Sequence, residues 1–342
     1  MQMNRMRKAA LVLAAVGMAL GTAAYASGAS ATTRESSAPQ GLSTLKVALV
    51  APSATNDLAF TQSMYSALET LKGTEKLQIS VSANEYVVSQ AADIIETYAH
   101  EGYNLIVAHG SQYGSIIEQL APKFPKVSFA WGTAGATFGM KNVFAYEASS
   151  NEGGYVQGYM AALLSKSKVL GICGPIATGD AKLYVDGFVD GAKAAAAANN
   201  YKVTAHTVYT GSFSDNSLMA SCAKTFVGNG ADVLTGSSQS VVGAIGVAKS
   251  DHKLWFGTQW NQSSLAPHNV VSSQVYNWVP ILKQMFTAIR GGTLGDATYV
   301  IGLGNGGEKI NFNKGYTLSA SVKTEAAKLI AEITDGSITV PQ

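Results

Sequence analysis

The sequence predicts an α/β protein made of two Rossmann-like lobes with a hinge and a ligand cleft between them. Short apolar runs rich in β-branched residues alternate with amphipathic helical patterns along most of the chain, and the alternation restarts near Val169. Such alternation is typical of βαβ units, in which helices cover both faces of a parallel sheet. A length of 342 residues fits two domains of about 100–200 residues each.

The first half contains five runs of strand length and four helical patterns with apolar residues three and four positions apart. The expected strands are Leu45–Ala51, Gln78–Ala83, Leu105–His109, Val127–Trp131 and Val143–Tyr146. The expected helices are Met64–Lys72, Val88–His100, Gly114–Leu120 and Asn151–Ser165.

The second half repeats this order. Its expected strands are Val169–Cys173, Lys202–Tyr209, Asp232–Leu234 and Leu254–Gly257, and its helices are Ala181–Ala198, Asn216–Val227 and Val241–Lys249. The segment from Asn104 is loosely similar to the segment from Ala231, and in each a strand is followed by Ser-Gln and a helix. Ser111-Gln112 and Ser238-Gln239 are therefore expected at equivalent strand-to-helix turns.

The segment after Gly257 predicts a hinge. It holds two further strand–helix pairs, Val270–Tyr276 with Val279–Ile289 and Tyr299–Leu303 with Val322–Thr334. One pair for each lobe means that the chain crosses between lobes more than once. We expect residues 44–164 with 259–292 in the first lobe, and 165–258 with 293–342 in the second. Ligands of open α/β sheets bind beyond the carboxyl ends of the strands, so the cleft is expected there.

The first 26 residues are typical of a cleaved secretory signal peptide. Met1–Lys8 carries three positive charges, Ala9–Ala23 is uncharged, and Ala24-Tyr25-Ala26 fits a small-x-small cleavage site. A transmembrane anchor needs about 20 apolar residues, more than this run supplies. With residues 27–43 as a flexible leader and no cysteine for lipid attachment near the cut, the mature protein is expected free in the periplasm.

Composition excludes two classes of partner. Without Arg5, Arg7 and Lys8, Lys+Arg falls from 24 to 21 against 22 Asp+Glu. A nearly neutral chain lacks the electrostatic footprint of a protein that binds nucleic acid or an anionic membrane.

No motif predicts catalysis, a metal or a cofactor. No long helix is expected after the glycine-rich segment Gly302–Gly307, as a dinucleotide-binding turn would require, and no P-loop, GxSxG or HExxH motif occurs. His109, at a strand end, is the one histidine expected near the cleft, and a structural role is favoured for it. Cys173 and Cys222 have no metal-ligand spacing, and both a disulfide and two buried thiols stay open for them.

The predicted strand ends carry aromatic, amide and carboxylate side chains. Such groups suit a planar heterocycle, because ring faces stack and amides and carboxylates pair with donors and acceptors at the ring edge. They occur in the turns Thr55–Gln62, Ser111–Tyr113, Gly211–Asp215 and Gly257–Asn261.

Three motifs in order resemble the basic membrane protein (BMP) family, substrate-binding proteins of ABC importers that are related to purine-nucleoside receptors. These are D-x-x-F-x-Q from Asp57, G-F-x-x-G-A from Gly187 and Y-x-G-S-F-x-D from Tyr209. The resemblance covers about Leu45 to Tyr316 and implies a type I periplasmic-binding-protein fold. It further implies that Phe60 and Phe213 are the aromatic walls of a purine site and that Asp57 is a ring-edge partner.

The sequence departs from the nucleoside-binding members of that family. Where those have an Asp in a G-V-D turn for the ribose hydroxyls and a downstream Lys, this chain has Gly257-Thr258-Gln259 and no Lys in Ser272–Trp278. A purine base is therefore favoured over a nucleoside. The full set of expected ligand contacts is Asp57, Phe60, Thr61, Gln62, Ser111, Tyr113, Glu152, Phe213, Ser238, Gln259, Trp260 and Asn261.

The leading hypothesis is a monomeric, non-enzymatic binding protein that passes its ligand to an ABC permease in the membrane. A ligand-sensing module for a membrane receptor is one alternative. An exported nucleoside hydrolase is the other, and it requires a metal or carboxylate cluster that the sequence does not indicate.

Overall fold

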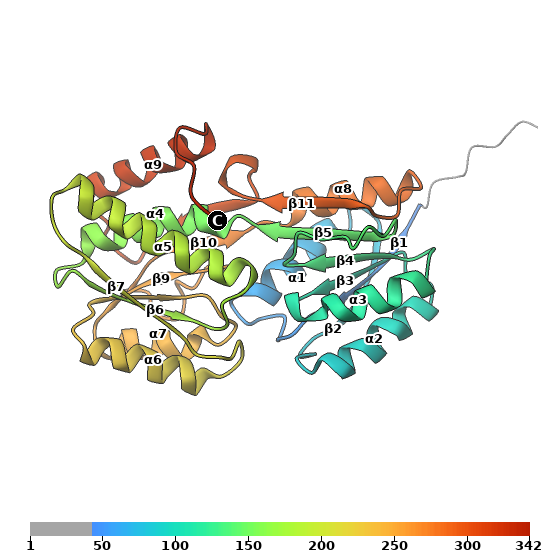
Figure 1. Ribbon diagram of the computed structural model, residues 1–342, viewed down its shortest axis with the longest axis horizontal. Helices are drawn as coiled ribbons and strands as arrows, with labels where there is room; N and C mark the ends of the chain where they lie inside the picture. The colour runs from blue at the N-terminus through green and yellow to red at the C-terminus, as the bar shows by residue number, and fades with distance from the viewer. Residues whose placement is uncertain (1–42) are drawn as a thin grey trace, which may run out of the picture. The chain divides into compact units, whose positions relative to one another are not determined.

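The computed structural model describes residues 43–342, which form two α/β lobes, each built on one six-stranded sheet (Figure 1). The expected signal peptide, and the leader up to residue 42, lie outside the described residues. None of the helices within residues 43–342 is both long and apolar enough to cross a membrane.

The first lobe has a fully parallel sheet in the order β11-β5-β4-β3-β1-β2. Its strands are β1 (Leu45–Val50), β2 (Leu77–Ser82), β3 (Leu105–His109), β4 (Ser128–Gly132), β5 (Val143–Ala148) and β11 (Ala297–Ile301). Its helices are α1 (Phe60–Leu71), α2 (Val88–His100), α3 (Gly114–Leu120) and α8 (Val279–Arg290).

The second lobe has the order β12-β10-β9-β8-β6-β7 and differs by one antiparallel edge strand, β12. Its strands are β6 (Val169–Gly174), β7 (Thr204–Tyr209), β8 (Val233–Gly236), β9 (Leu254–Gly257), β10 (Val270–Tyr276) and β12 (Glu308–Phe312). Its helices are α4 (Ser150–Leu164), α5 (Gly179–Ala198), α6 (Asn216–Gly228), α7 (Val241–Ser250) and α9 (Ala320–Thr334). Since β3 and β8 hold the same place in the two orders, the expected equivalence of Ser111-Gln112 and Ser238-Gln239 agrees with the topology.

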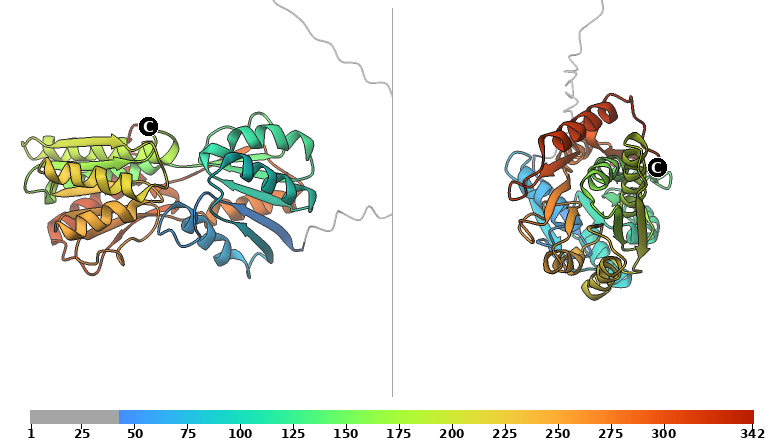
Figure 2. Two further views of the ribbon diagram at one scale, coloured as in Figure 1. Left: turned by 90° about the horizontal axis from the view of Figure 1, so that it is seen from below. Right: turned by 90° about the vertical axis from the view of Figure 1, so that its left-hand side faces the viewer.

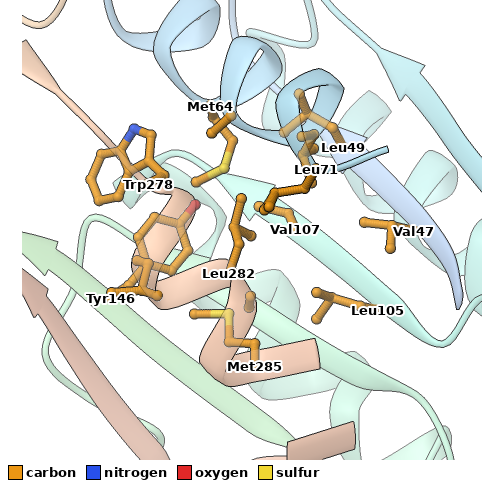
Figure 3. Close-up of a cluster of buried hydrophobic side chains, with 14 of the residues drawn as sticks. Val47, Leu49, Met64, Leu71, Leu105, Val107, Tyr146, Trp278, Leu282 and Met285 are labelled. Carbon is orange, nitrogen blue, oxygen red and sulfur yellow. The ribbon is translucent and has the colours of Figure 1, made fainter. Parts of the chain in front are cut away.

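Alternating side chains of the strands supply both faces of each sheet. In β1, Val47 and Leu49 belong to one buried cluster with α1 and α8, whereas Ala48 and Val50 belong to another with α2 and α3. Figure 3 shows the first of these clusters, in which side chains of α1 and α8 and Trp278 face those of β1 and β3.

Three crossovers connect the lobes, and Figure 2 shows chain segments running between them. They run from β5 to α4, from β10 to α8 and from β11 to β12. Backbone hydrogen bonds join them, because Ser149 N donates to Ile301 O (2.8 Å) and Asn277 N donates to Gly307 O (2.7 Å). The chain was expected to cross between the lobes more than once, and it does so in three adjacent segments.

The expected lobe boundaries were wrong at three elements. Helix α4 packs on α5, and β10 pairs with β9, so both belong to the second lobe, whereas β11 pairs with β5 in the first. The strand and helix of each C-terminal pair therefore serve different lobes. Sequence periodicity identifies a strand or helix, but it does not say which sheet the element joins.

Helices α4 and α5 pack unusually closely through glycines. A Cβ on Gly158 would lie 1.9 Å from the backbone oxygen of Phe188, and one on Gly191 would lie 1.9 Å from that of Tyr155. Gly187 is equally constrained, with a Cβ distance of 2.2 Å to Asn151 O. The glycines of the G-F-x-x-G-A motif are therefore needed for helix packing.

Cys173 at the end of β6 and Cys222 in α6 form a disulfide across 49 residues of sequence. In the chain-entropy account, a loop of this length stabilises the folded state by about 4 kcal/mol. Both half-cystines are buried in the core between α6, α7 and the sheet.

Candidate functional site

The carboxyl ends of eight strands surround a pocket between the two lobes. The first lobe contributes Pro52, Phe60, Tyr86, Gly110, Ser111, Gln112 and Thr133, and the second contributes Thr178, Asp180, Phe213, Gln239 and Gln259. Its free space is about 20 Å³, enough for little more than one water molecule. A ligand the size of a heterocycle therefore requires the lobes to move apart before it can enter.

Phe60 is held rigidly on the first-lobe wall. It is the first residue of α1, and its ring stacks on His109 with a centroid distance of 3.7 Å and an interplanar angle of 7°. His109 Nε2 lies 3.0 Å from Phe60 O, a pure acceptor, so Nε2 carries the proton and Nδ1 accepts from the Tyr146 hydroxyl (2.7 Å). His109 thus has the structural role that the sequence favoured.

Burial lowers the pKa of His109 to about 3, and its hydrogen bond to the Phe60 carbonyl only partly opposes this. The imidazole is therefore neutral at physiological pH, and the wall below Phe60 carries no charge.

Phe213 projects from the second lobe after β7. Its backbone N–H donates to the Tyr86 hydroxyl of the first lobe (3.3 Å), and its carbonyl accepts from Ser238 Oγ (2.7 Å). Ser238, an expected ligand contact, thus supports the Phe213 loop and does not line the pocket. Of the expected contacts, Phe60, Ser111, Phe213 and Gln259 are brought together at the pocket.

The carboxylate of Asp57 accepts its hydrogen bonds from the first turn of α1 and from the loop before it. Its Oδ1 accepts from the backbone N–H groups of Ala59 (2.8 Å) and Gln62 (3.1 Å), and its Oδ2 accepts from Thr61 N (3.1 Å) and Ser53 Oγ (2.5 Å). These four donors occupy the lone-pair sites of a carboxylate. Burial nevertheless raises the pKa of Asp57, and the four hydrogen bonds counter that effect.

Five further expected contacts also lie off the pocket lining. Thr61 pairs with Ser53 Oγ, Gln62 accepts from Leu58 N, and the buried Tyr113 hydroxyl donates to Glu85 O. Trp260 lines a separate groove beside α1, and Asn261 is exposed.

Glu152 belongs to the hinge. Its Oε2 accepts from Leu303 N (2.8 Å), which joins the first turn of α4 to the third crossover. Burial raises the pKa of Glu152, and the bond from Leu303 opposes that rise. Glu308, the first residue of β12, lies close by and is also buried with a pKa well above its usual range.

Asp180 is the main pocket residue that the sequence analysis missed. It lies in the first turn of α5 and is 6% exposed. Its carboxylate accepts from Thr133 Oγ1 (3.1 Å), Gln259 Nε2 (3.1 Å) and the Tyr276 hydroxyl (2.9 Å). Burial raises the pKa of Asp180, and these hydrogen bonds oppose the rise. Its place after the β6 strand end was the available signal, but an Asp at a helix start also looks like an ordinary cap.

Other missed pocket residues are Tyr86, Gln112, Thr133, Thr178 and Gln239. Gln112 and Gln239 follow Ser in the repeated strand-to-helix turns that the sequence predicts to be equivalent, although neither was among the expected contacts. None of the residues that line the pocket is Lys or Arg. Within residues 43–342, no three His, Cys, Asp or Glu side chains are grouped to hold a metal ion.

The Bmp family, described as "ABC transporter substrate-binding protein PnrA-like", matches residues 44–342. The chain belongs to the Bmp family. This is a family of binding proteins and not of enzymes, and membership implies a small-molecule ligand and a membrane permease as partner.

Curated relatives of this Bmp protein are similar over most of its length. The ABC transporter nucleoside-binding protein BmpA of Lactococcus lactis is 26% identical over 87% of this chain and 89% of its own. The transcriptional activator protein med of Bacillus subtilis is 26% identical over 76% of this chain and 80% of its own. The purine-binding protein BAB2_0673 of Brucella abortus is 27% identical over 64% and 61%.

Solved structures confirm the predicted type I fold of two lobes. An ABC transporter solute-binding protein from Conexibacter woesei superposes with a TM-score of 0.71 and 23% identity, over 87% of this chain and 98% of that one. A transcriptional activator of the comK gene from Bacillus halodurans gives a TM-score of 0.71 at 17% identity, over 87% and 100%.

Proposed function

We propose that this Bmp protein is exported, captures a purine between its lobes and delivers it to an ABC importer. The observation that carries the proposal is the placement of Phe60 and Phe213, one from each lobe, on the walls of one pocket. Two aromatic rings on opposite lobes suit a planar ligand that both lobes grip, and the ligand then stabilises the closed state by its preference for it. Relatives named for purine and nucleoside binding support the same class.

A free base is proposed in preference to a nucleoside. The family resemblance implies an Asp at the ribose contact of nucleoside-binding members, and this chain has Gln259 at the matching position. The carboxylate that does line the pocket, Asp180, already accepts from Thr133, Gln259 and Tyr276.

Calorimetric titration with adenine, guanine, hypoxanthine and the matching nucleosides tests this proposal. We expect at least one base to bind, and to bind more tightly than its nucleoside. Native mass spectrometry of the purified protein gives an independent view, since a tightly held base is expected to appear as an added mass. Tighter binding of nucleosides would contradict the preference for a base, and no binding of any purine would contradict the purine class.

A sensing role is the second candidate, because two similar proteins are named transcriptional activators. The two roles differ in what happens to the ligand after capture. Deleting the gene is expected to abolish uptake of labelled purine if the protein serves an importer. Unchanged uptake together with altered transcription would favour sensing.

A further inference from the structure

The contacts of Asp180 connect three parts of the molecule. Thr133 follows β4 in the first lobe, Gln259 follows β9 in the second, and Tyr276 ends β10 directly before the second crossover. Gly179, just before Asp180, has a φ of +50°, and a Cβ there would lie 2.7 Å from Thr133 Oγ1. The turn is therefore shaped to bring Thr133 against Asp180.

Asp180 fixes which way the Gln259 amide points. A carboxylate only accepts hydrogen bonds, so the group that faces Asp180 Oδ2 at 3.1 Å is the amide NH₂, which also lies 3.4 Å from Ser237 Oγ. The amide oxygen must then point the other way. Gln259 Oε1 is buried and has no hydrogen-bond partner among the described residues, although its residue lines the pocket.

The backbone conformation of Gln259 also supports a role for this residue in ligand binding. Its φ is +67°, a conformation that costs free energy for a residue with a side chain and that persists where the surroundings impose it. Gln239 Oε1, a second buried oxygen of the pocket lining, is also without a partner among residues 43–342. A buried acceptor without a hydrogen bond costs free energy, so we expect the ligand to donate a hydrogen bond to each of these oxygens.

We infer that Asp180 is a positioning residue that holds the oxygen of Gln259 toward the ligand, so that this side of the pocket selects a ligand with an N–H donor. The inference rests on the proposed function and makes it more specific. The pocket is expected to prefer a nitrogen heterocycle that is neutral or cationic over an anion, because its two buried unpaired oxygens are acceptors and neither Lys nor Arg lines it. Phosphorylated purines are rejected for the same reason.

Adenine and hypoxanthine are the probes, because the donor and acceptor at their six-membered ring edges are exchanged. With an amide at position 180, the neighbour of Gln259 can donate as well as accept, and the Gln259 amide is free to turn over. Asp180→Asn is therefore expected to change the ratio of the adenine and hypoxanthine dissociation constants at least tenfold. A ratio that stays within about threefold of the parent would overturn the inference.

Two further variants separate positioning from general damage. In a Gln259→Leu background, Asp180→Asn is expected to leave the ratio unchanged, because the group that Asp180 orients is gone. A tenfold change in that background would overturn the inference. Gln259→Leu alone tests the acceptor even if Asp180→Asn does not fold, and unaltered binding of both bases by this variant would also overturn it.

Asp190→Asn is the matched control. Asp190 is on the same helix, is partly exposed and pairs with Lys193, so its replacement is expected to change neither affinity nor ratio. Adenosine monophosphate is the probe for charge, and binding comparable to that of adenine would contradict the exclusion of anions. If the parent protein binds neither base, the proposed function fails. If it binds them and the ratio does not respond, only the role of Asp180 fails.

Discussion

Phe60 lines the pocket, and its ring packs against two other rings of the protein. His109 stacks on it at 3.7 Å, and the Trp278 ring meets it edge-on with centroids 6.4 Å apart. The ring is therefore fixed before any ligand arrives, and little ordering entropy remains to be lost on binding.

Replacing Phe60 or Phe213 by Ala is expected to weaken purine binding roughly 5- to 150-fold. Stacking of a base on an aromatic ring contributes on the order of 1–3 kcal/mol, and each substitution removes one ring. Calorimetric titration measures the loss, which should be similar for adenine, guanine and hypoxanthine because every purine has the same kind of face. Parent-like affinity in both variants would mean that these rings serve only packing.

His109 makes stability depend on pH in the acid range. Its pKa is about 3 in the folded protein and about 6.5 in an unfolded chain, so between these values only the unfolded chain binds the proton. Stability from this group is complete above about pH 6.5 and is lost as the pH falls toward 3. By pH 5 the parent should lose about 2 kcal/mol more than His109→Gln, relative to each protein at pH 7. Urea unfolding at the two pH values measures this, and equal losses would contradict it.

Asp57 and Asp180 show what residue type alone does not reveal. Both are acidic residues at the start of a helix that follows a strand, and the family resemblance implied Asp57 as the ligand contact. In the structure, four local donors form hydrogen bonds with the carboxylate of Asp57, whereas Asp180 lines the pocket. The difference depends on which backbone N–H groups and distant side chains reach each carboxylate, and these contacts are set by tertiary structure.

At the scale of elements, the contact between α4 and α5 leaves no room for side chains. We expect Gly191→Ala to destabilise the protein by about 1–3 kcal/mol, since its Cβ would lie 1.9 Å from Tyr155 O and the helices would have to separate. Thermal unfolding checks this. Gly246→Ala in α7 is the control, because no atom lies within 4 Å of a Cβ there, and it should be neutral or stabilise by up to about 1 kcal/mol. A Gly191→Ala protein as stable as the parent would show that the helices can move apart freely.

Elements with a strong period were predictable, and elements defined by their partners were not. The pattern from Val88 to His100 predicts α2, and its bounds are the same in the structure. Strand β12, with the short polar sequence Glu308–Phe312, was missed because an antiparallel edge strand needs only one buried side. The sheet that β10 joins depends on its pairing with β9, a contact between segments that no local pattern records.

At the scale of the whole molecule, a ligand that touches both lobes should hold them together. Three hydrogen bonds already link the lobes across the cleft: Tyr86 with Phe213, Thr133 with Asp180, and Leu58 O with Gln262 Nε2. We expect small-angle scattering to show a smaller radius of gyration at saturating purine than without it. A radius that does not respond to a bound ligand would contradict closure about the hinge, though not binding itself.

The small pocket has a consequence for rates. With free space of about 20 Å³ and three hydrogen bonds between the lobes, the closed protein has no room for a heterocycle. Only the open fraction of molecules can load, which lowers the apparent affinity by that fraction. The lobes must also open before a bound ligand can dissociate. The rate at which the hinge opens therefore limits how fast the protein binds ligand at high ligand concentration. It also sets how long a bound ligand stays in the pocket.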